Sequence, residues 1–223
     1  MSGVITFVAD VHIQPDSKKD TERFIGWIER AKVESRHVFI LGDLFNYWFT
    51  GIEKHVRQVL DALCAANVHI LPGNRDFLIT NCSASGINIM REEEIISTPL
   101  HRKALITHGH TLTSDDYGFR LLHAFGWPVL KVLDRSLPSI FKDRLARFLV
   151  KSSAAIRPPR AVIDTDVAGR KGVDVVICGH LHRMIMSEKL IVLPSFFDSG
   201  KWLVLDEGGP RVESENMKIR EGQ

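Results

Sequence analysis

Short apolar runs separated by amphipathic stretches mark the first half of the chain. Residues 4–9, 37–41, 68–71 and 103–107 are rich in Val, Ile, Leu and Phe, which is typical of buried strands. Residues 21–32 and 53–66 carry apolar side chains every three or four positions, as amphipathic helices do. This alternation predicts an α/β fold in which the four strands share one layer.

The second half shows a different pattern. Residues 173–178 form another strand-like apolar run, and shorter runs follow it, split by turns. These later runs are residues 184–188, 190–193, 201–205 and 211–215. We expect them to form antiparallel strands.

Residues 117–160 lie between these two patterns and are predicted to be helical. Breaks are expected near Trp127-Pro128 and Leu137-Pro138, because proline interrupts helices. The second helix carries an apolar stripe of Ile140, Phe141, Leu145, Phe148 and Leu149. The default interpretation is that such a stripe docks the helix on the body of the protein. The alternative is a groove for acyl chains, lined by Phe125, Trp127, Leu130 and Phe141.

The composition fits one domain with an uneven charge. The chain has 223 residues, 44% of them hydrophobic, and a net charge of +2. We expect a single domain over residues 1–223, with the helical insertion at about 117–170. Residues 117–160 hold nine Lys and Arg but only two Asp. This surplus predicts attraction to an anionic lipid-linked nucleotide or an anionic membrane surface, and a nucleic acid would be attracted too.

Three observations concern location. Cys64, Cys82 and Cys178 are odd in number and form no CxxC motif, which indicates free thiols in a reducing compartment. The N-terminus enters a strand pattern without the features of a signal peptide. No apolar run approaches the roughly 20 residues of a membrane span. We expect a cytoplasmic protein, with contact to the inner membrane only at its surface.

Polar residues follow five of the predicted strands, at the point where each strand ends. Glycine accompanies most of them, which allows tight turns and close backbone approach. Ligands of α/β sheets bind at the carboxyl ends of strands, so these residues should converge. The set consists of Asp10, His12, Asp43, Asn74, His108, His180 and His182.

This set has the chemistry of a site for two divalent ions. Asp43 is the natural bridge, because a carboxylate has two oxygens. One ion would take Asp10, His12, Asp43 and His182, and the other Asp43, Asn74, His108 and His180. Nitrogen and oxygen ligands without thiolates suit Mn, Fe, Zn or Co. Any one of these segments alone would be a weak signal, but five at strand ends together favour a dinuclear centre that displaces groups at phosphorus.

The same motifs resemble those of the calcineurin-like metallophosphoesterases. Within that superfamily the chain is similar to the bacterial UDP-2,3-diacylglucosamine pyrophosphatases (hydrolases) of lipid A synthesis. The likeness is carried by residues 41–45 with Trp48, by 73–78 and by 108–116. The chain departs from the pattern where residues 49–51 replace an acidic run and where Leu181 replaces a threonine. The segment between His108 and His180 is also shorter than is usual there.

The resemblance implies a fold, a cofactor and products. The fold would be a four-layer α/β/β/α sandwich with a helical cap over the metals. The two ions would be manganese, and the products UMP and a lipid monosaccharide phosphate. Asp116 would contact the substrate, whereas the polar substrate contacts that the family has in its cap have no clean equivalents here.

Arg75 bears on the leaving group. Many metallophosphoesterases carry a histidine after the asparagine of this motif, and its imidazole can protonate a poor leaving group. Arginine stays charged and cannot act as an acid, but it can clamp phosphoryl oxygens. A diphosphate bond suits such a site, because phosphate leaves as a stable anion. The alternative is that Arg75 only pairs with Asp76, which we otherwise expect to support His12 or another ligand.

The leading hypothesis is a dinuclear hydrolase that converts UDP-2,3-diacylglucosamine to UMP and the lipid sugar 1-phosphate. Its expected catalytic residues are Arg75, Asp43 and His180. Its expected substrate contacts are Asn74, Arg75, Asp116 and His180. The alternative is a phosphodiesterase or nuclease of the same superfamily, although the chain lacks a basic groove interleaved with aromatic residues. A non-catalytic module is disfavoured because all seven candidate ligands are retained.

Overall fold

Two five-stranded sheets form the centre of the computed structural model, which describes residues 3–113, 126–155, 163 and 166–215. The first sheet has the order β10-β9-β1-β2-β3, and the second has the order β4-β5-β6-β8-β7. The first sheet comprises β1 (Ile5–Val8), β2 (His37–Leu41), β3 (Val68–Leu71), β9 (Lys201–Asp206) and β10 (Gly209–Ser214). The second comprises β4 (Glu93–Ser97), β5 (Lys103–Thr107), β6 (Val175–Cys178), β7 (Ile185–Met186) and β8 (Leu190–Val192).

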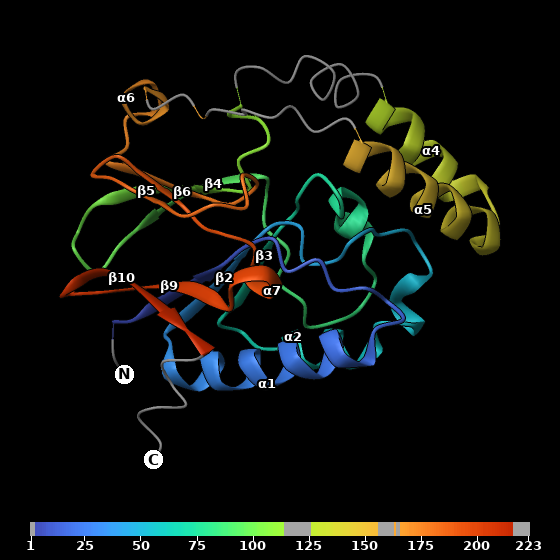
Figure 1. Ribbon diagram of the computed structural model, residues 1–223, viewed down its shortest axis with the longest axis horizontal. Helices are drawn as coiled ribbons and strands as arrows, with labels where there is room; N and C mark the ends of the chain where they lie inside the picture. The colour runs from blue at the N-terminus through green and yellow to red at the C-terminus, as the bar shows by residue number, and fades with distance from the viewer. Residues whose placement is uncertain (1–2, 114–125, 156–162, 164–165, 216–223) are drawn as a thin grey trace.

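Helices cover the outer faces of the two sheets. α1 (Lys18–Glu34) and α2 (Arg57–Leu63) pack on the first sheet, and α6 (Val167–Lys171) packs on the second (Figure 1). Apolar side chains from both sheets, including Phe7, Phe39 and Ile177, fill the space between them. The architecture is therefore the α/β/β/α sandwich that the resemblance implied.

Helix α1 begins three residues earlier than expected. The side chain of Ser17 accepts a hydrogen bond from the Asp20 N–H at 3.2 Å, which satisfies a donor of the first turn and fixes the start at Lys18. Phe24, Trp27, Ile28 and Ala31 are its buried residues. The apolar pattern marked the buried face correctly, but the polar capping turn before it carries no periodic signal.

Two expectations about the first layer were wrong. The helix expected at 53–66 is divided into a 3-10 turn (Ile52–Lys54) and α2, because Val56 leaves helical geometry with φ −113° and ψ 17°. β5 lies in the second sheet rather than the first, where it pairs parallel to β6 and antiparallel to β4. A strand buried on both faces is apolar throughout, so its pattern does not reveal which sheet it joins.

The remaining short elements join these layers. A 3-10 turn (Phe77–Asn81) follows β3, and α7 (Phe196–Ser199) precedes β9. The expected antiparallel pairing holds for β7 with β8 and for β9 with β10. However, β8 also pairs parallel to β6, and β9 pairs with β1, so the tail is divided between the two sheets.

Two antiparallel helices, here called the helical hairpin, lie beside the sandwich. They are α4 (Trp127–Ser136) and α5 (Ser139–Ala155), and the break at Leu137-Pro138 is confirmed. Trp127 joins the core of the first sheet and stacks on Phe77, with ring centroids 4.1 Å apart. Within the described residues, no helix is long and apolar enough to cross a membrane.

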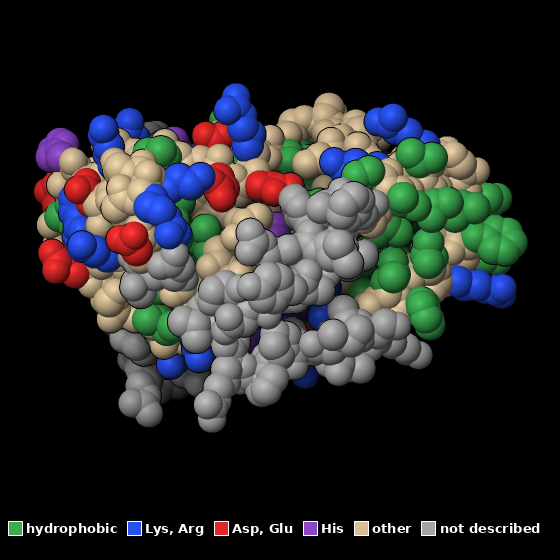
Figure 2. All heavy atoms as spheres, turned by 90° about the horizontal axis from the view of Figure 1, so that it is seen from above, with side chains coloured by type: hydrophobic (Ala, Val, Ile, Leu, Met, Phe, Trp, Pro, Cys, Tyr) green, Lys and Arg blue, Asp and Glu red, His purple; other side chains and the backbone are tan. Residues whose placement is uncertain are grey.

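The apolar stripe of α5 does not dock as a whole. Leu145 and Leu149 face a cavity under the hairpin, whereas Ile140, Phe141 and Phe148 are 61%, 55% and 65% exposed. Val129 and Val132 of α4 are 56% and 63% exposed. We call these five exposed side chains the exposed apolar face. Figure 2 shows hydrophobic side chains gathered at this end of the molecule.

Candidate metal centre

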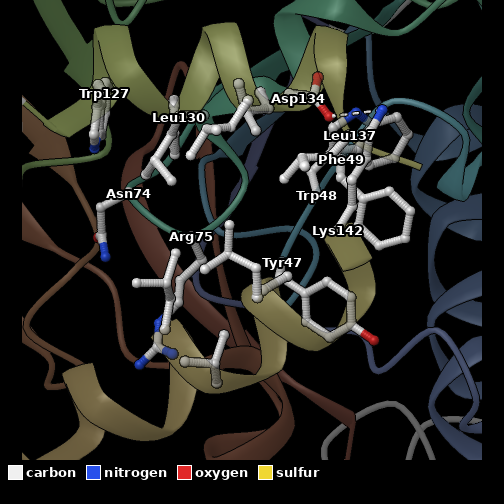
Figure 3. Close-up of a pocket in the computed structure, with 17 residues that line it drawn as sticks. Tyr47, Trp48, Phe49, Asn74, Arg75, Trp127, Leu130, Asp134, Leu137 and Lys142 are labelled. Atoms are coloured by element: carbon white, nitrogen blue, oxygen red, sulfur yellow. Dashed lines mark ion pairs between the residues drawn. The ribbon is translucent and has the colours of Figure 1, made fainter. Parts of the chain in front are cut away.

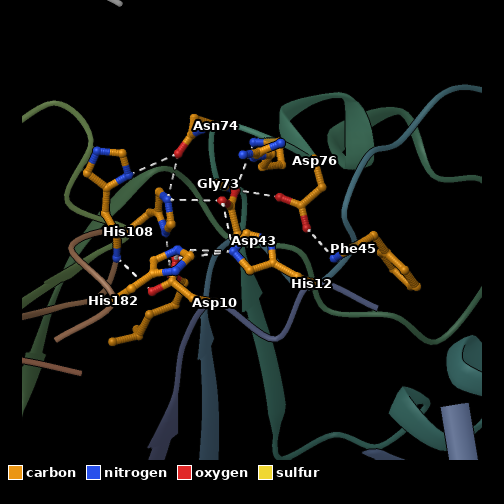
Figure 4. A network of polar contacts seen from close by, with 12 residues as sticks. Asp10, His12, Asp43, Phe45, Gly73, Asn74, Asp76, His108 and His182 are labelled. Atoms are coloured by element: carbon orange, nitrogen blue, oxygen red, sulfur yellow. Dashed lines mark hydrogen bonds and ion pairs between the residues drawn. The ribbon is translucent and has the colours of Figure 1, made fainter. Parts of the chain in front are cut away.

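Loops that follow five strands meet at one edge of the sandwich. β1, β2 and β3 are parallel, so the loops carrying Asp10, Asp43 and Asn74 leave the first sheet on the same side. β5 and β6 are parallel in the second sheet and lead into His108 and His180. The His180 N–H donates to Asp10 Oδ2 at 2.7 Å, which joins the two sets of loops. Figure 4 shows Asp10, Asp43 and His108 within this network of polar contacts.

One group of potential ligands comes from the loops after β1, β2 and β6. The Nε2 atoms of His12 and His182 lie 3.1 Å apart. Asp10 Oδ1 lies 3.2 Å from His182 Nε2, and Asp43 Oδ2 lies 3.9 Å from His12 Nε2. These four side chains are those assigned to one ion from the sequence.

A second group lies on the other side of Asp43. Asn74 Oδ1 is 2.8 Å from His108 Nε2 and 3.1 Å from His180 Nδ1. Asp43 Oδ2 is 3.6 Å from the same His108 nitrogen. Asp43 therefore faces both groups, as a bridging carboxylate would. The structure brings all seven candidate side chains together.

The backbone of this edge is strained. Asp10, His12, Asp43, His180 and His182 all have left-handed conformations, with φ between 50° and 69°. Residues other than glycine rarely adopt this backbone conformation, and each instance costs on the order of 1–3 kcal/mol. Such strain persists where the surrounding structure requires it, and it is concentrated here on five of the seven candidate ligands.

Close packing explains two of the glycines. Gly42 has φ +78°, and a Cβ there would lie 2.7 Å from the His108 ring. A Cβ on Gly73 would collide with the Asp43 carboxylate and backbone. Any larger residue at these two positions would displace a candidate ligand.

The electrostatics of the cluster favour a positive charge among the carboxylates. Burial acts to raise the pKa of Asp10, but the contact with His182 and the neighbouring His108 outweigh it and hold that pKa far below its usual range. Burial acts to lower the pKa of His108, yet Asp43 and Asp10 raise it above its usual value. A proton on His108 Nε2 or a metal ion beside it would equally supply that charge.

Other candidate ligands are in the protonation state that binds a metal ion. Burial, assisted by His108, lowers the pKa of His180 to about 4, and burial lowers the pKa of His12. Both imidazoles are therefore neutral near pH 7, which is the form that ligates metals. Asp10 Oδ1 and His12 Nδ1 are buried and have no hydrogen-bond partner among the described residues. Mixed carboxylate, amide and imidazole donors around these buried atoms fit two divalent ions.

Most of the chain matches a known protein family. A family model described as calcineurin-like phosphoesterase matches residues 3–184. The chain belongs to the calcineurin-like phosphoesterase family. It is therefore a metal-dependent hydrolase.

Three related phosphoesterases carry the same name, UDP-2,3-diacylglucosamine hydrolase. The protein of Yersinia enterocolitica is 32% identical to this chain, over 79% of this chain and 81% of its own length. The Klebsiella pneumoniae protein is 30% identical, over 82% and 83%. The Pseudomonas putida protein is 29% identical, over 85% of each chain. The match to each covers most of both chains.

Asp76 has a different role in this phosphoesterase from the one expected. It accepts hydrogen bonds from the N–H groups of Gly73 at 2.8 Å and of Phe45 at 3.1 Å, not from His12. It thus joins the loop that carries Asp43 to the loop that carries Asn74. Burial and the nearby Asp43 raise the pKa of Asp76 to about 7.

Two further polar residues can be placed relative to the phosphoesterase site, and a third cannot. The backbone N–H of Arg75 donates to Asp43 Oδ1 at 2.8 Å, and its side chain lines the cavity under the hairpin. His110 is buried, with its ring 5.4 Å from His108 and 5.7 Å from Trp127. Asp116, expected to contact the substrate, lies outside the described residues.

The sequence did not reveal how His108 is oriented. Its Nδ1 lies 2.9 Å from the carbonyl of Leu41, so a proton on Nδ1 directs Nε2 toward Asn74 and Asp43. The partner is a backbone atom, which no residue type can signal.

An apolar cavity of about 280 Å³ opens beside the phosphoesterase centre, between the helical hairpin and the loops after β2 and β3. Asn74 and Arg75 belong to both the centre and the cavity (Figure 3). The rest of the lining is mainly aromatic and aliphatic. It comprises Tyr47, Trp48, Phe49, Phe77, Leu78, Trp127, Leu130, Leu133, Asp134, Leu137, Lys142, Leu145, Ala146, Leu149 and Val150.

Proposed function

We propose that this hydrolase cleaves the diphosphate bond of UDP-2,3-diacylglucosamine and releases UMP and the lipid sugar 1-phosphate. The observation that carries this proposal is the apolar cavity that shares Asn74 and Arg75 with the metal centre. A substrate with a diphosphate next to acyl chains needs a polar and an apolar site side by side. The names of the three relatives support the same substrate.

We propose that the seven side chains hold two ions, manganese being our first choice. Asp10, His12, Asp43 and His182 would hold one ion, and Asp43, Asn74, His108 and His180 the other. When bound, two such ions acidify a water molecule and stabilise negative charge at phosphorus. Asp43 sets the spacing of the two groups, because one of its oxygens faces His12 and His108 alike.

Arg75 defines which bonds this site can break. Its guanidinium stays charged and can hold phosphoryl oxygens as charge develops in the transition state. An attacking water forms a bond to one phosphorus and gives up a proton to the solvent, and the bond from that phosphorus to the bridging oxygen breaks. The departing phosphate is a stable anion and needs no proton from the protein. Asn74 and His180, whose Oδ1 and Nδ1 atoms lie 3.1 Å apart, would complete the proposed substrate contacts.

A comparison of four substrates tests the proposal. The manganese-loaded protein would be assayed with UDP-2,3-diacylglucosamine, the deacylated UDP-sugar, an aryl phosphodiester and single-stranded DNA. We expect kcat/KM to be highest for the diacylated compound, with UMP as one product. Cleavage of only the aryl diester or the DNA would establish a phosphodiesterase or nuclease instead.

We also propose that the exposed apolar face meets the anionic surface of the inner membrane from the cytoplasmic side. Lys131, Arg135 and Arg144 are exposed on the same two helices. Apolar side chains that enter the lipid boundary and cations that attract acidic head groups act together at such surfaces. This contact would bring the cavity, on the other face of the hairpin, close to its lipid substrate.

A further inference from the structure

The cavity under the helical hairpin has two ends of different character. Asn74 and Arg75 lie at the end that it shares with the metal centre. Asp134, Leu137 and Lys142 lie at the opposite side (Figure 3). The lining between them is mainly aliphatic and aromatic. A straight apolar group that begins at the metal centre therefore runs toward Asp134 and Lys142.

A buried ion pair lines that far end. Asp134 Oδ1 lies 3.5 Å from Lys142 Nζ, and the two side chains are only 2% and 11% exposed. Asp134 also accepts hydrogen bonds from the Thr50 N–H at 2.8 Å and from the Thr50 hydroxyl at 2.6 Å. Lys142 donates to the Thr50 carbonyl at 3.2 Å. We call these three residues, which join α4, α5 and the segment after β2, the end wall.

The end wall cannot yield as easily as the rest of the lining. An apolar side chain can change its rotamer when a ligand presses on it. Separating Asp134 from Lys142 would leave an unpaired charge in apolar surroundings, which is far more costly. Whichever charged side chain moved would also lose its hydrogen bonding to Thr50.

We propose that the end wall sets the longest straight alkyl chain that this protein can bury. The inference rests on the proposed function, because it takes the cavity to be the site of an acyl chain of the substrate. Methylene groups up to the wall gain burial, and those beyond it gain none. Asp134 and Lys142 are thereby residues that determine chain-length specificity without contacting the diphosphate.

The size of the cavity assigns the wall to one chain. Its volume of about 280 Å³ lies at the lower limit of the roughly 300–1,000 Å³ found for ligand cavities. Two acyl chains side by side would need more room than this. The end wall would therefore limit the length of only one of the two acyl chains of a diacylated substrate.

Binding of straight-chain fatty acids tests the inference without any hydrolysis. The full chain would be titrated with saturated fatty acids of increasing length that displace a fluorescent apolar dye from the cavity. We expect affinity to rise about four-fold per added methylene up to one length and then to stay constant. A continuous rise through the whole series, or no displacement by any fatty acid, would overturn the proposal.

We call the chain length at which affinity stops rising the break. Two variants should move it in opposite directions. Asp134→Ala combined with Lys142→Ala removes the wall without leaving a lone buried charge, so affinity should keep rising past the wild-type break. Leu137→Phe fills the far end and leaves the ion pair intact, so the break should come at a shorter chain. As a control, Lys18→Ala removes a cation that is 87% exposed on α1, away from the cavity, and should leave the break where it is.

A loosened hairpin in the double variant would be detected with short fatty acids. If the wall alone is lost, affinities for chains below the break stay at the wild-type level. If those affinities fall as well, Leu137→Phe decides the question. An unchanged break in Leu137→Phe would then overturn the inference.

Hydrolysis assays separate this inference from the proposed function. A break in fatty-acid affinity in a protein that does not cleave the diacylated UDP-sugar would retain the wall and reject the substrate. Cleavage with kcat/KM independent of acyl length would retain the substrate and reject the wall. Both hold if kcat/KM falls for acyl chains beyond the break and recovers in the double variant.

Discussion

At the scale of single residues, Asp43 is the point on which the metal centre depends. One of its oxygens lies 3.9 Å from His12 Nε2 and 3.6 Å from His108 Nε2, and the other accepts the Arg75 N–H. It has a left-handed backbone, and Gly73 gives it room. Its carboxylate thus joins the two groups of candidate metal ligands to Arg75, the proposed substrate contact.

Metal content should respond differently to three substitutions. His182→Ala and His108→Ala each remove a ligand of one ion, so the bound metal should fall from about two ions per chain to about one. Asp43→Ala removes the bridge and should lower both occupancies. Elemental analysis after gel filtration measures this. His101→Ala, at an exposed left-handed histidine outside the centre, is the matched control and should retain two ions.

Arg75→Ala should lower kcat by about 10²–10³-fold, because it removes a positive group aimed at transition-state charge. Arg75→Lys should recover part of the loss, since lysine keeps the charge but not the bidentate geometry. Steady-state kinetics on the diacylated UDP-sugar measure both. Arg91→Ala, at an exposed arginine, serves as the control. Near wild-type turnover in Arg75→Ala would show that the guanidinium has no catalytic role.

The sequence indicated which side chains converge at the candidate site but not which hydrogen bonds hold them in place. Asp, Asn and His at strand ends could be recognised because parallel strands bring their carboxyl ends to one edge. The roles of Asp76 and Leu41 could not be read in this way, because their partners are the backbone N–H groups of Gly73 and Phe45 and the ring of a distant histidine. Left-handed backbone at non-glycine residues likewise leaves no mark in a sequence.

At the scale of elements, the helical hairpin is attached to the sandwich at several points. Trp127 stacks on Phe77 with an interplanar angle of 9°. At the other end of α4, Asp134 bonds to Thr50, and on α5 the carboxylate of Asp143 accepts the Tyr47 hydroxyl at 3.1 Å. These contacts fix the helical hairpin over the cavity at both of its ends.

Trp127→Ala should destabilise the protein by about 3–5 kcal/mol, because it removes a large buried side chain from a packed core. The free energy of unfolding in urea measures this. Val129→Ala lies two residues away on the exposed side of α4 and should change stability by less than about 0.5 kcal/mol. Equal effects of the two substitutions would contradict the packing described for Trp127.

Element types were easier to predict than element partners. The runs at β1, β2, β3 and β6 were identified from apolar composition alone. β4 was not, because Glu93 and Glu94 interrupt its apolar character and its partially exposed edge needs no apolar run. The second sheet includes β5 because β5 pairs with β4, close in sequence, and with β6, far along the chain. Such pairing cannot be inferred from the composition of β5 itself.

At the scale of the whole molecule, the sandwich carries the candidate metal centre, and the proposed function assigns lipid binding to the hairpin. The four-layer order came from the family resemblance and not from periodicity, which cannot tell one sheet from two. Periodicity also could not show that one helix stripe would be divided between a cavity and solvent. That division depends on how α4 and α5 lie against each other.

Binding to lipid vesicles should depend on the exposed apolar face. Replacing Ile140, Phe141 and Phe148 by serine should abolish most co-sedimentation with vesicles that contain anionic phospholipid, because apolar side chains no longer enter the lipid. Val33→Ser is a matched control, since Val33 is 87% exposed on α1. Equal binding of the triple variant and the wild type would show that this face does not contact membranes.

The position of the metal centre has a consequence for folding. Its ligands come from the loops of both sheets, so each ion would act as a cross-link between two layers that otherwise meet through apolar packing and a few hydrogen bonds at this edge. An ion that binds only the folded chain stabilises it by about 4 kcal/mol at a thousand times its dissociation constant. Loss of metal would therefore loosen the sandwich itself, and a shortage of the ion would limit how much folded protein persists.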